Sequence, residues 1–192
     1  MRMHVGLAAS IVAIGLGITT PTRTQILSVA DRVHESPLAF AGRLAGLYAP
    51  SSKWWRTASP ARDEAYRRQV QTAFLEPGFV KLMDDNGALA GARGGGPDLD
   101  YDPLCQCQDA PEDLHVVSAA RRGAAAAIVS MKVACGGPNG CTMFDIALRR
   151  GRHGWRVHDV MERAGSVRAR LIRHNACLRA ARTEAAAEAC LA

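Results

Sequence analysis

A stretch rich in carboxylates and thiols, DLDYDPLCQCQD, occupies residues 98–109. This combination could bind a metal ion, take part in catalysis or form a structural corner. Its aspartates stand at positions 1, 3, 5 and 12 of a twelve-residue loop, the ligand spacing of calcium-binding helix–loop–helix motifs: Asp98, Asp100, Asp102 and Asp109. Position 6 of such a loop needs glycine, but here it is Pro103, whose ring fixes a negative φ. We therefore do not expect a calcium loop.

The two cysteines of this stretch, Cys105 and Cys107, could form half of a soft-metal site. Two further ligands would be needed, with His115 among the nearest candidates. We favour a corner in which aspartate side chains accept backbone N–H groups and Gln108-Asp109 satisfies the backbone before the first strand. The sequence thus predicts a hydrogen-bonded, disulfide-tied corner at a pocket rim, without a resident metal or cofactor, and gives three candidate binding residues: Asp102, Gln108 and Asp109.

The N-terminus has the pattern of a secretory signal peptide. Arg2 precedes an uncharged, mostly apolar run from Val5 to Ile18, which is shorter than the ~20 residues of a bilayer span. Small residues before Asp31 place the predicted cleavage after residue 30. An uncleaved N-terminal anchor is the alternative, and it would be the protein's one link to the membrane. Both interpretations predict a periplasmic or secreted protein.

In an oxidising compartment the six cysteines are expected to pair. Cys135 and Cys141 flank a Gly-Pro-Asn-Gly turn, where facing strand residues reach the ~5.5 Å Cα separation that a disulfide prefers. This pair would clamp a hairpin. A bond between Cys105 and Cys107 would close a small, strained ring, so partners elsewhere are equally compatible with the sequence.

The last two cysteines, Cys177 and Cys190, are separated by thirteen residues. Along a straight helix this separation corresponds to ~20 Å, which is too far for a disulfide. They can pair only if the helix breaks between them, either at His174-Asn175 or near Thr183.

Two helices are predicted from Ser-Pro starts, at Ser36-Pro37 and Ser59-Pro60. Apolar residues follow each start at helical spacing: Phe40, Leu44, Leu47 and Tyr48 in the first, and Tyr66, Val70, Ala73 and Phe74 in the second. A short turn after Pro77-Gly78 is expected to add Phe79, Leu82 and Met83 to the same core. Residues 87–97, GALAGARGGGP, are typical of a flexible surface loop.

Four strands are predicted at residues 114–120, 126–135, 142–149 and 155–160, where apolar residues alternate. Short turns predict an antiparallel meander, followed by a helix from Gly165-Ser166. The fold class is therefore α+β, with N-terminal helices packed on one face of a curved antiparallel sheet of about four strands and a C-terminal helix. We expect one domain over residues 31–178 and an Ala-rich helical tail over residues 179–192.

The chain carries a net charge of +6, with many arginines in its C-terminal third. A solvated basic face explains this distribution. Nucleic-acid binding is not expected, because aromatic residues make up 5% of the chain and no binding motif is present.

No catalytic set is predicted from the sequence. His158 and Asp159 are neighbours on a predicted strand, so their side chains should point to opposite faces. His158 could meet Asp145 across a hairpin. We expect Trp155 in the core or lining a ligand pocket, and adjacent Trp54 and Trp55 either in helix packing or on a contact surface, since both indoles cannot easily be buried on one helix face.

Three motifs carry a resemblance to a known family. They are Asp102-Pro103, Gln108-Asp109, and GWRVHDV at residues 154–160, the last followed by a Ser-Val-Arg-Ala-Arg-Leu helix. Over about residues 36–175 the chain resembles an uncharacterised group of secreted bacterial proteins and lipoproteins, a domain of unknown function with the cystatin-like, or nuclear-transport-factor-like, cone fold. The cysteines at 105 and 107 and the cysteine-containing tail depart from the group's pattern. The resemblance implies an envelope protein with a concave sheet and a pocket, and it brings no catalytic residues.

These observations predict an exported, non-catalytic binding or envelope-associated protein that takes a small ligand or partner segment in a concave sheet pocket. One alternative is an enzyme that uses a pocket Asp or His as acid or base. Another is an inhibitor or immunity-type partner of a second protein. The candidate binding residues outside the corner are Trp54, Trp55, Trp155, His158 and Asp159.

Overall fold

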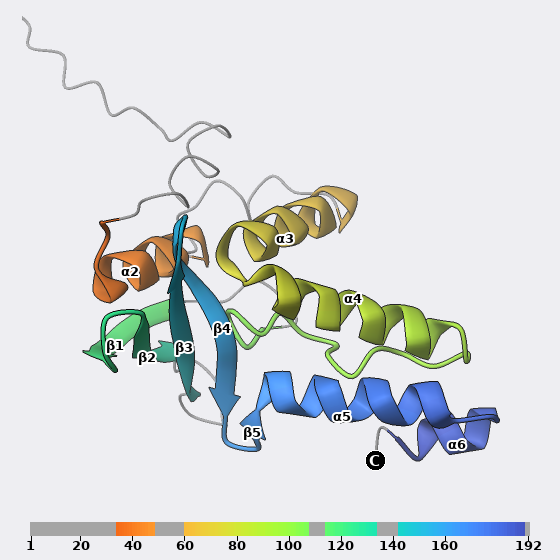
Figure 1. Cartoon of the computed structure of the whole chain (residues 1–192). Coiled ribbons are helices and arrows are strands. Elements are labelled where there is room, and N and C mark those ends of the chain that lie inside the picture. Colours follow the sequence, from red (N-terminus) through yellow and green to blue (C-terminus); the bar gives the residue numbers. More distant parts are fainter. Residues whose placement is uncertain (1–33, 49–59, 108–113, 134–141, 191–192) are drawn as a thin grey trace, which may run out of the picture.

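The computed structural model describes residues 34–48, 60–107, 114–133 and 142–190 (Figure 1). Three helices come first: α2 (Pro37–Tyr48), α3 (Pro60–Phe74) and α4 (Pro77–Gly91). The sheet follows as β1 (Leu114–Arg121), β2 (Ala126–Val133), β3 (Met143–Gly151), β4 (Gly154–Glu162) and β5 (Gly165–Ser166). The last elements are α5 (Val167–Ala180) and α6 (Glu184–Glu188). The predicted signal peptide, Trp54, Trp55, Gln108, Asp109 and the Cys135–Cys141 pair lie outside the described residues.

The two predicted Ser-Pro starts begin helices. In α2, the Ser36 hydroxyl accepts a 3.1 Å hydrogen bond from the Ala39 N–H, and Pro37 occupies the first helical position. Phe40, Leu44 and Tyr48 are buried on one stripe of α2, which packs against β1 and β2. The prediction of an amphipathic helix here is confirmed.

The sheet is an antiparallel meander in the order β1-β2-β3-β4-β5. Val129, Ile146 and Val160 pair across β2, β3 and β4, and all three are fully buried. Alternate residues along β2 and β3 point into the core because successive side chains of a strand face opposite sides. The predicted α+β class is confirmed, and β5 adds a short fifth strand.

Helix α4 corrects one prediction. We expected a short turn after Pro77-Gly78 and a loop from residue 87, but the helix continues to Gly91. A glycine inside a helix costs about 1 kcal/mol relative to alanine. Burial of Phe79 and Ala90, together with packing of α4 against α5, outweighs this local cost.

The C-terminal helices are joined by a disulfide. Ser166 caps α5, since its hydroxyl accepts a 2.9 Å bond from the Ala169 N–H. The helix continues through residues 174–175 and ends at Ala180, so the break lies just before Thr183, the second of the two predicted positions. Cys177 and Cys190 then approach to a Cα separation of 5.7 Å and are bonded. The Ala-rich tail is helical over Glu184–Glu188.

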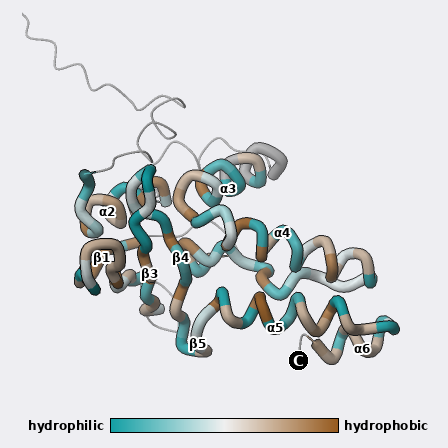
Figure 2. The backbone as a smooth tube through the Cα atoms, viewed as in Figure 1, coloured by the Kyte–Doolittle hydropathy of each residue, from teal (hydrophilic) through white to brown (hydrophobic). Residues whose placement is uncertain are grey.

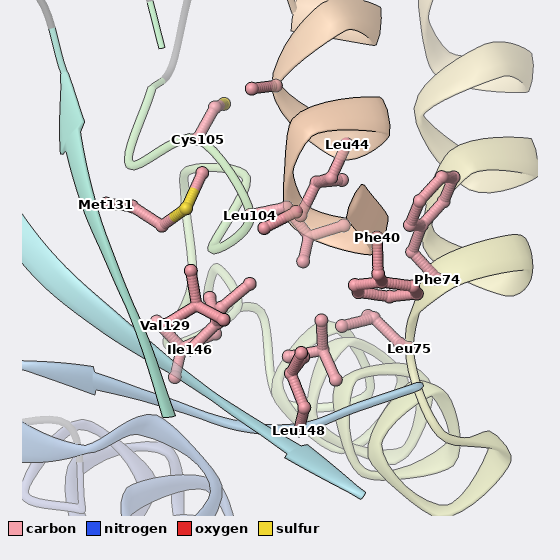
Figure 3. Packing of buried hydrophobic residues seen from close by; sticks show 14 of the residues in the cluster. Phe40, Leu44, Phe74, Leu75, Leu104, Cys105, Val129, Met131, Ile146 and Leu148 are labelled. Atoms are coloured by element: carbon pink, nitrogen blue, oxygen red, sulfur yellow. The ribbon is translucent and has the colours of Figure 1, made fainter. Parts of the chain in front are cut away.

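Two apolar clusters stabilise this arrangement. The larger one lies between the sheet and the helices α2 and α3, and Figure 3 shows Phe40 and Phe74 meeting residues of β2 and β3 there. The smaller one joins the end of α4 to α5 and α6 through Ala90, Leu178 and Ala187. Figure 2 shows hydrophobic and hydrophilic residues along each helix, as expected for elements with one face on a core. Within the described ranges, no helix has the length and apolar character needed to cross a bilayer.

The central strand β3 provides a test of the core. Ile146 is 0% exposed, and Ile146→Ala should lower the free energy of unfolding by about 3 kcal/mol, because it leaves a cavity in a packed interior. Ile172→Ala is the matched control, since Ile172 is 50% exposed and its loss should cost less than about 1 kcal/mol. Urea unfolding of both variants measures the difference. Equal losses would contradict the burial described for β3.

Candidate functional site

A cavity of about 470 Å³ lies between α3, α4 and the segment that leads into the corner. Its volume is within the range of small-molecule sites. We expected a pocket on the concave face of the sheet, but the inner residues of that face are buried against the helices, and this cavity has no strand residue in its lining. It is lined by Glu64, Arg67, Arg68, Gln71, Met83, Asp84, Asn86, Gly87, Pro97, Leu99, Asp100, Tyr101, Asp102 and Leu171.

Asp102 is the buried acid of this cavity. Its side chain is withdrawn from solvent, with 2% of the residue exposed. One carboxylate oxygen accepts a 2.7 Å bond from the Tyr48 hydroxyl, and the other accepts a 3.0 Å bond from the Leu104 N–H. Burial raises the pKa of the Asp102 carboxyl, while these donors and the Gln71 side chain oppose the rise by stabilising the charged form. The acid is thus held by α2, α3 and the corner.

The corner itself is closed by backbone hydrogen bonds around Asp102. Its N–H donates to the Cys107 carbonyl at 2.9 Å, and its carbonyl accepts from Gln106 at 2.9 Å and from Cys105 at 3.3 Å. A disulfide joins Cys105 to Cys107, one of the pairings that the sequence left open. Gln106 between them has a φ of 56°. The hydrogen-bonded, disulfide-tied corner predicted from the sequence is present, and it forms part of the cavity wall.

The rest of the lining combines apolar walls with charged groups. Met83 and Leu99, both partly exposed, supply apolar surface. At the rim, Arg68 and Asp84 form a two-point ion pair with one N···O distance of 2.7 Å, and both side chains are 46% exposed. An exposed pair of this kind contributes little to stability, so its charges are available to a ligand at small cost. The cavity therefore suits a ligand with both apolar and polar parts.

A partly buried ionic network supports the wall. Arg170 on α5 contacts Asp98 at 3.0 Å, Glu162 at 3.1 Å and the Tyr101 hydroxyl at 2.7 Å. Burial, with the Glu162 carboxylate next to it, raises the pKa of the Tyr101 phenol well above its usual value. The Asp98 N–H also donates to the Asn86 side chain at 2.7 Å, which fixes the segment to α4. Asp98, one of the aspartates with calcium-loop spacing, thus binds an arginine side chain.

His158 and Asp159 do not meet the cavity. His158 is the extra residue of a bulge in β4, opposite Ala147 and Leu148. Because of the bulge, Val157 and Val160 are both buried although they are three residues apart. The side chains of β4 therefore do not show the strict alternation between the two faces of the sheet that we predicted. The histidine Nδ1 lies 2.7 Å from Glu76, and its Nε2 lies 3.2 Å from Arg149. His158 therefore contacts Glu76, the N-cap residue of α4, and not Asp145.

Asp159 caps α5 instead of facing a ligand. Its carboxylate accepts a 2.5 Å bond from the Ser166 hydroxyl and a 2.9 Å bond from the Arg168 N–H. Asp145 pairs in register with Met161, so Asp145, His158 and Asp159 do not converge in one cleft. Trp155 is in the core, as one of the two interpretations predicted, and its indole N–H donates to the Glu35 carbonyl at 2.8 Å.

Asp102 alone among the described candidate residues lines the cavity. The lining residues of α3 and α4 were not among the residues predicted from the sequence. Arg67 and Gln71 line the cavity and are four residues apart on α3, so they lie on the same face of the helix. Their spacing in the sequence could have indicated a shared polar face. Within the described ranges, no group of three or more His, Cys, Asp or Glu residues is arranged to hold a metal ion.

Comparison with known proteins adds little to this picture. No family model matches the chain, and no curated protein matches it. One similar solved structure is a phospholipid-binding protein from Ralstonia solanacearum, in complex with a phospholipid. It is 16% identical, the alignment covers 88% of this chain and 79% of that chain, and the TM-score is 0.32.

The raised pKa of Asp102 predicts a pH dependence. Below about pH 3 this carboxyl is mostly protonated in both the folded and the unfolded state. As the pH rises, the Asp102 carboxyl ionises first in the unfolded state, because its pKa is raised in the folded state. The free energy of unfolding that this group contributes therefore falls between the unfolded and the folded pKa and is constant above the folded pKa. The stability of the wild type minus that of Asp102→Asn should therefore fall with rising pH and then level off.

Urea unfolding of both proteins between about pH 3 and pH 8 measures this difference. Subtracting the two curves removes the contribution of every other titrating group. If the stability of the wild type relative to Asp102→Asn instead grows as the pH rises, the pKa of Asp102 is lowered in the folded state. The hydrogen bonds to its carboxylate would then have a larger effect on the pKa than its burial.

Proposed function

We propose that this protein is an exported, non-catalytic binding protein of the bacterial envelope, which holds a small ligand or a short partner segment in the cavity beside Asp102. The observation that carries the proposal is the cavity itself, about 470 Å³ in volume, with apolar walls and a charged rim. Its walls come from segments far apart in the chain that are fixed to one another by buried and partly buried polar bonds, so the site is formed before a ligand arrives.

The hydrogen bonds in this region favour binding over proton transfer. Both Asp102 oxygens already accept hydrogen bonds, so the carboxylate is positioned but is not free to act as a base. His158 has Glu76 on one ring nitrogen and Arg149 on the other, and it does not line the cavity. These contacts support a role for the acid in fixing the cavity wall and a structural role for the histidine.

Two disulfides support export. Cys105–Cys107 and Cys177–Cys190 are both bonded, and disulfides persist mainly in oxidising compartments such as the periplasm. With the N-terminal apolar run, they favour a periplasmic or secreted location. We also infer, from the motifs at Asp102-Pro103 and residues 154–160, membership of the secreted domain-of-unknown-function group that the sequence resembles.

A substitution that fills the cavity with a larger side chain tests the proposal. Gly87 on α4 lines the cavity, and a Cβ at this position would meet nothing within 4 Å. Gly87→Leu should therefore fold at least as stably as the wild type, since it removes a helix glycine that costs about 1 kcal/mol. Its side chain would occupy ligand space, so we expect loss of binding. Both proteins are dialysed against an extract of envelope metabolites, lipids and short peptides, and retained molecules are identified by mass spectrometry.

Gly91→Leu is the matched control. Gly91 lies one turn further along the same helix, has the same free space at its Cβ, and is not part of the cavity lining. This variant should retain the same molecules as the wild type. If the wild type retains nothing, or if both leucine variants retain the same molecules as the wild type, the cavity is not the binding site.

A further inference from the structure

The two described disulfides close rings of very different size. Cys105 and Cys107 are two positions apart, whereas Cys177 and Cys190 are thirteen apart. In the chain-entropy account, a disulfide stabilises a fold by restricting the unfolded chain, and the effect grows with the length of the closed loop. The longer loop therefore contributes substantially to the fold. The bond of the corner contributes little, so opening it costs the protein little global stability.

The residue inside the small ring has an unfavourable backbone conformation. Gln106 has a φ of 56°, and it is the one non-glycine residue with a positive φ among those that the structure describes. Side chains with a Cβ disfavour this left-handed region. The backbone bonds from Gln106 and Cys105 to the Asp102 carbonyl, together with the disulfide, keep the residue there. Opening the disulfide removes one of these restraints and lets the strain relax.

The sulfur atoms differ in accessibility. Cys105 is 0% exposed and belongs to the apolar core, while Cys107 is partly exposed. Cys107 packs against the edge of the core with part of the residue open to solvent, so the approach of an incoming thiolate is from the Cys107 side of the bond. The sulfur of Cys105 lies 3.6 Å from the Asp102 carbonyl oxygen, an acceptor for the S–H group that forms when the bond opens.

We propose that Cys107 is a thiol–disulfide exchange site, at which an external thiol opens the Cys105–Cys107 bond and thereby loosens the wall of the cavity around Asp102. The external thiolate bonds to the Cys107 sulfur, and the electron pair of the broken S–S bond leaves on the Cys105 sulfur, which takes up a proton. A second external thiol attacks the mixed disulfide at its external sulfur. Cys107 is released as a thiol, and the two external thiols leave as a disulfide.

The exchange reaches the cavity through Asp102. The same residue donates its N–H to Cys107, accepts from Gln106 and Cys105 through its carbonyl, and lines the cavity with its side chain. A change in the ring therefore changes the backbone that positions the buried acid. This exchange at Cys107 does not depend on which ligand the cavity binds.

Cys177–Cys190 supplies the control in the same molecule. The intact protein is equilibrated in buffers of reduced and oxidised dithiothreitol, the free thiols are alkylated, and each cysteine is quantified by mass spectrometry. We expect Cys105 and Cys107 to be half alkylated at about tenfold less reductant than Cys177 and Cys190, a shift of about 30 mV in reduction potential. Because Cys177 is itself exposed, exposure alone does not produce this order. Simultaneous opening, or earlier opening of the C-terminal bond, would overturn the proposal.

Hydrogen exchange tests the coupling to the cavity. After selective reduction, the Asp102 and Gln106 amides, which donate within the corner, should exchange about tenfold faster or more. The amides of β2 and β3 report on global unfolding and should keep their rates. Unchanged rates at Asp102 and Gln106 would show that the ring opens without affecting the cavity wall, which contradicts the proposal.

Two substitutions isolate the backbone effect. Gln106→Gly and Gln106→Ala both remove the side-chain amide bonds to Pro103 and Glu162, but only glycine adopts a positive φ without strain. The glycine variant should need about threefold more reductant than the alanine variant to open the ring, because its oxidised form is relieved. Equal midpoints would show that the conformation of Gln106 does not favour opening, and would contradict the strain argument.

Discussion

A buried carboxylate holds the arrangement around the cavity together. Transferring the charged form of Asp102 out of water is costly unless its oxygens are hydrogen-bonded. Its donors come from separate elements, with Tyr48 at the end of α2, Gln71 on α3 and Leu104 in the corner. The Asp102 carboxylate accepts all of these hydrogen bonds only when the three elements are in place. The same hydrogen bonds hold each element in position. The cavity lies at this junction.

A second polar cluster fixes the opposite wall. Asn86 on α4 donates to Asn175 on α5 at 3.0 Å, and Asn175 donates in turn to the Leu82 carbonyl. Arg170, one turn before Asn175, binds the segment that carries Asp98. Buried networks of this kind specify a single geometry because every alternative leaves a polar group unpaired. The apolar cluster at the ends of α4, α5 and α6 supplies stability but little directional information.

The elements were readable from the sequence because they depend on neighbours in the chain. Ser-Pro starts and alternating apolar residues predicted α2, α3 and four strands, and the Asp-Pro turn pointed to Asp102 as a site residue. A pocket with the corner at its rim was predicted, but it was expected on the concave face of the sheet. The position of the cavity was not predicted, because its geometry depends on partners such as Tyr48, 54 positions from Asp102, and Asn86, 89 positions from Asn175. The bulge at His158 depends likewise on the pairing of β3 with β4.

The cysteines of the corner are not explained by stability alone. The backbone bonds between Asp102, Gln106 and Cys107 already close the turn, as they do in many turns without sulfur. A ring that spans one residue adds little loop entropy, whereas the C-terminal bond fixes a five-residue helix that could not persist alone. The Cys177–Cys190 disulfide thus stabilises the end of the chain, where few apolar residues are buried. The other places a reactive bond against the wall of the cavity, where it contributes chemistry more than it contributes stability.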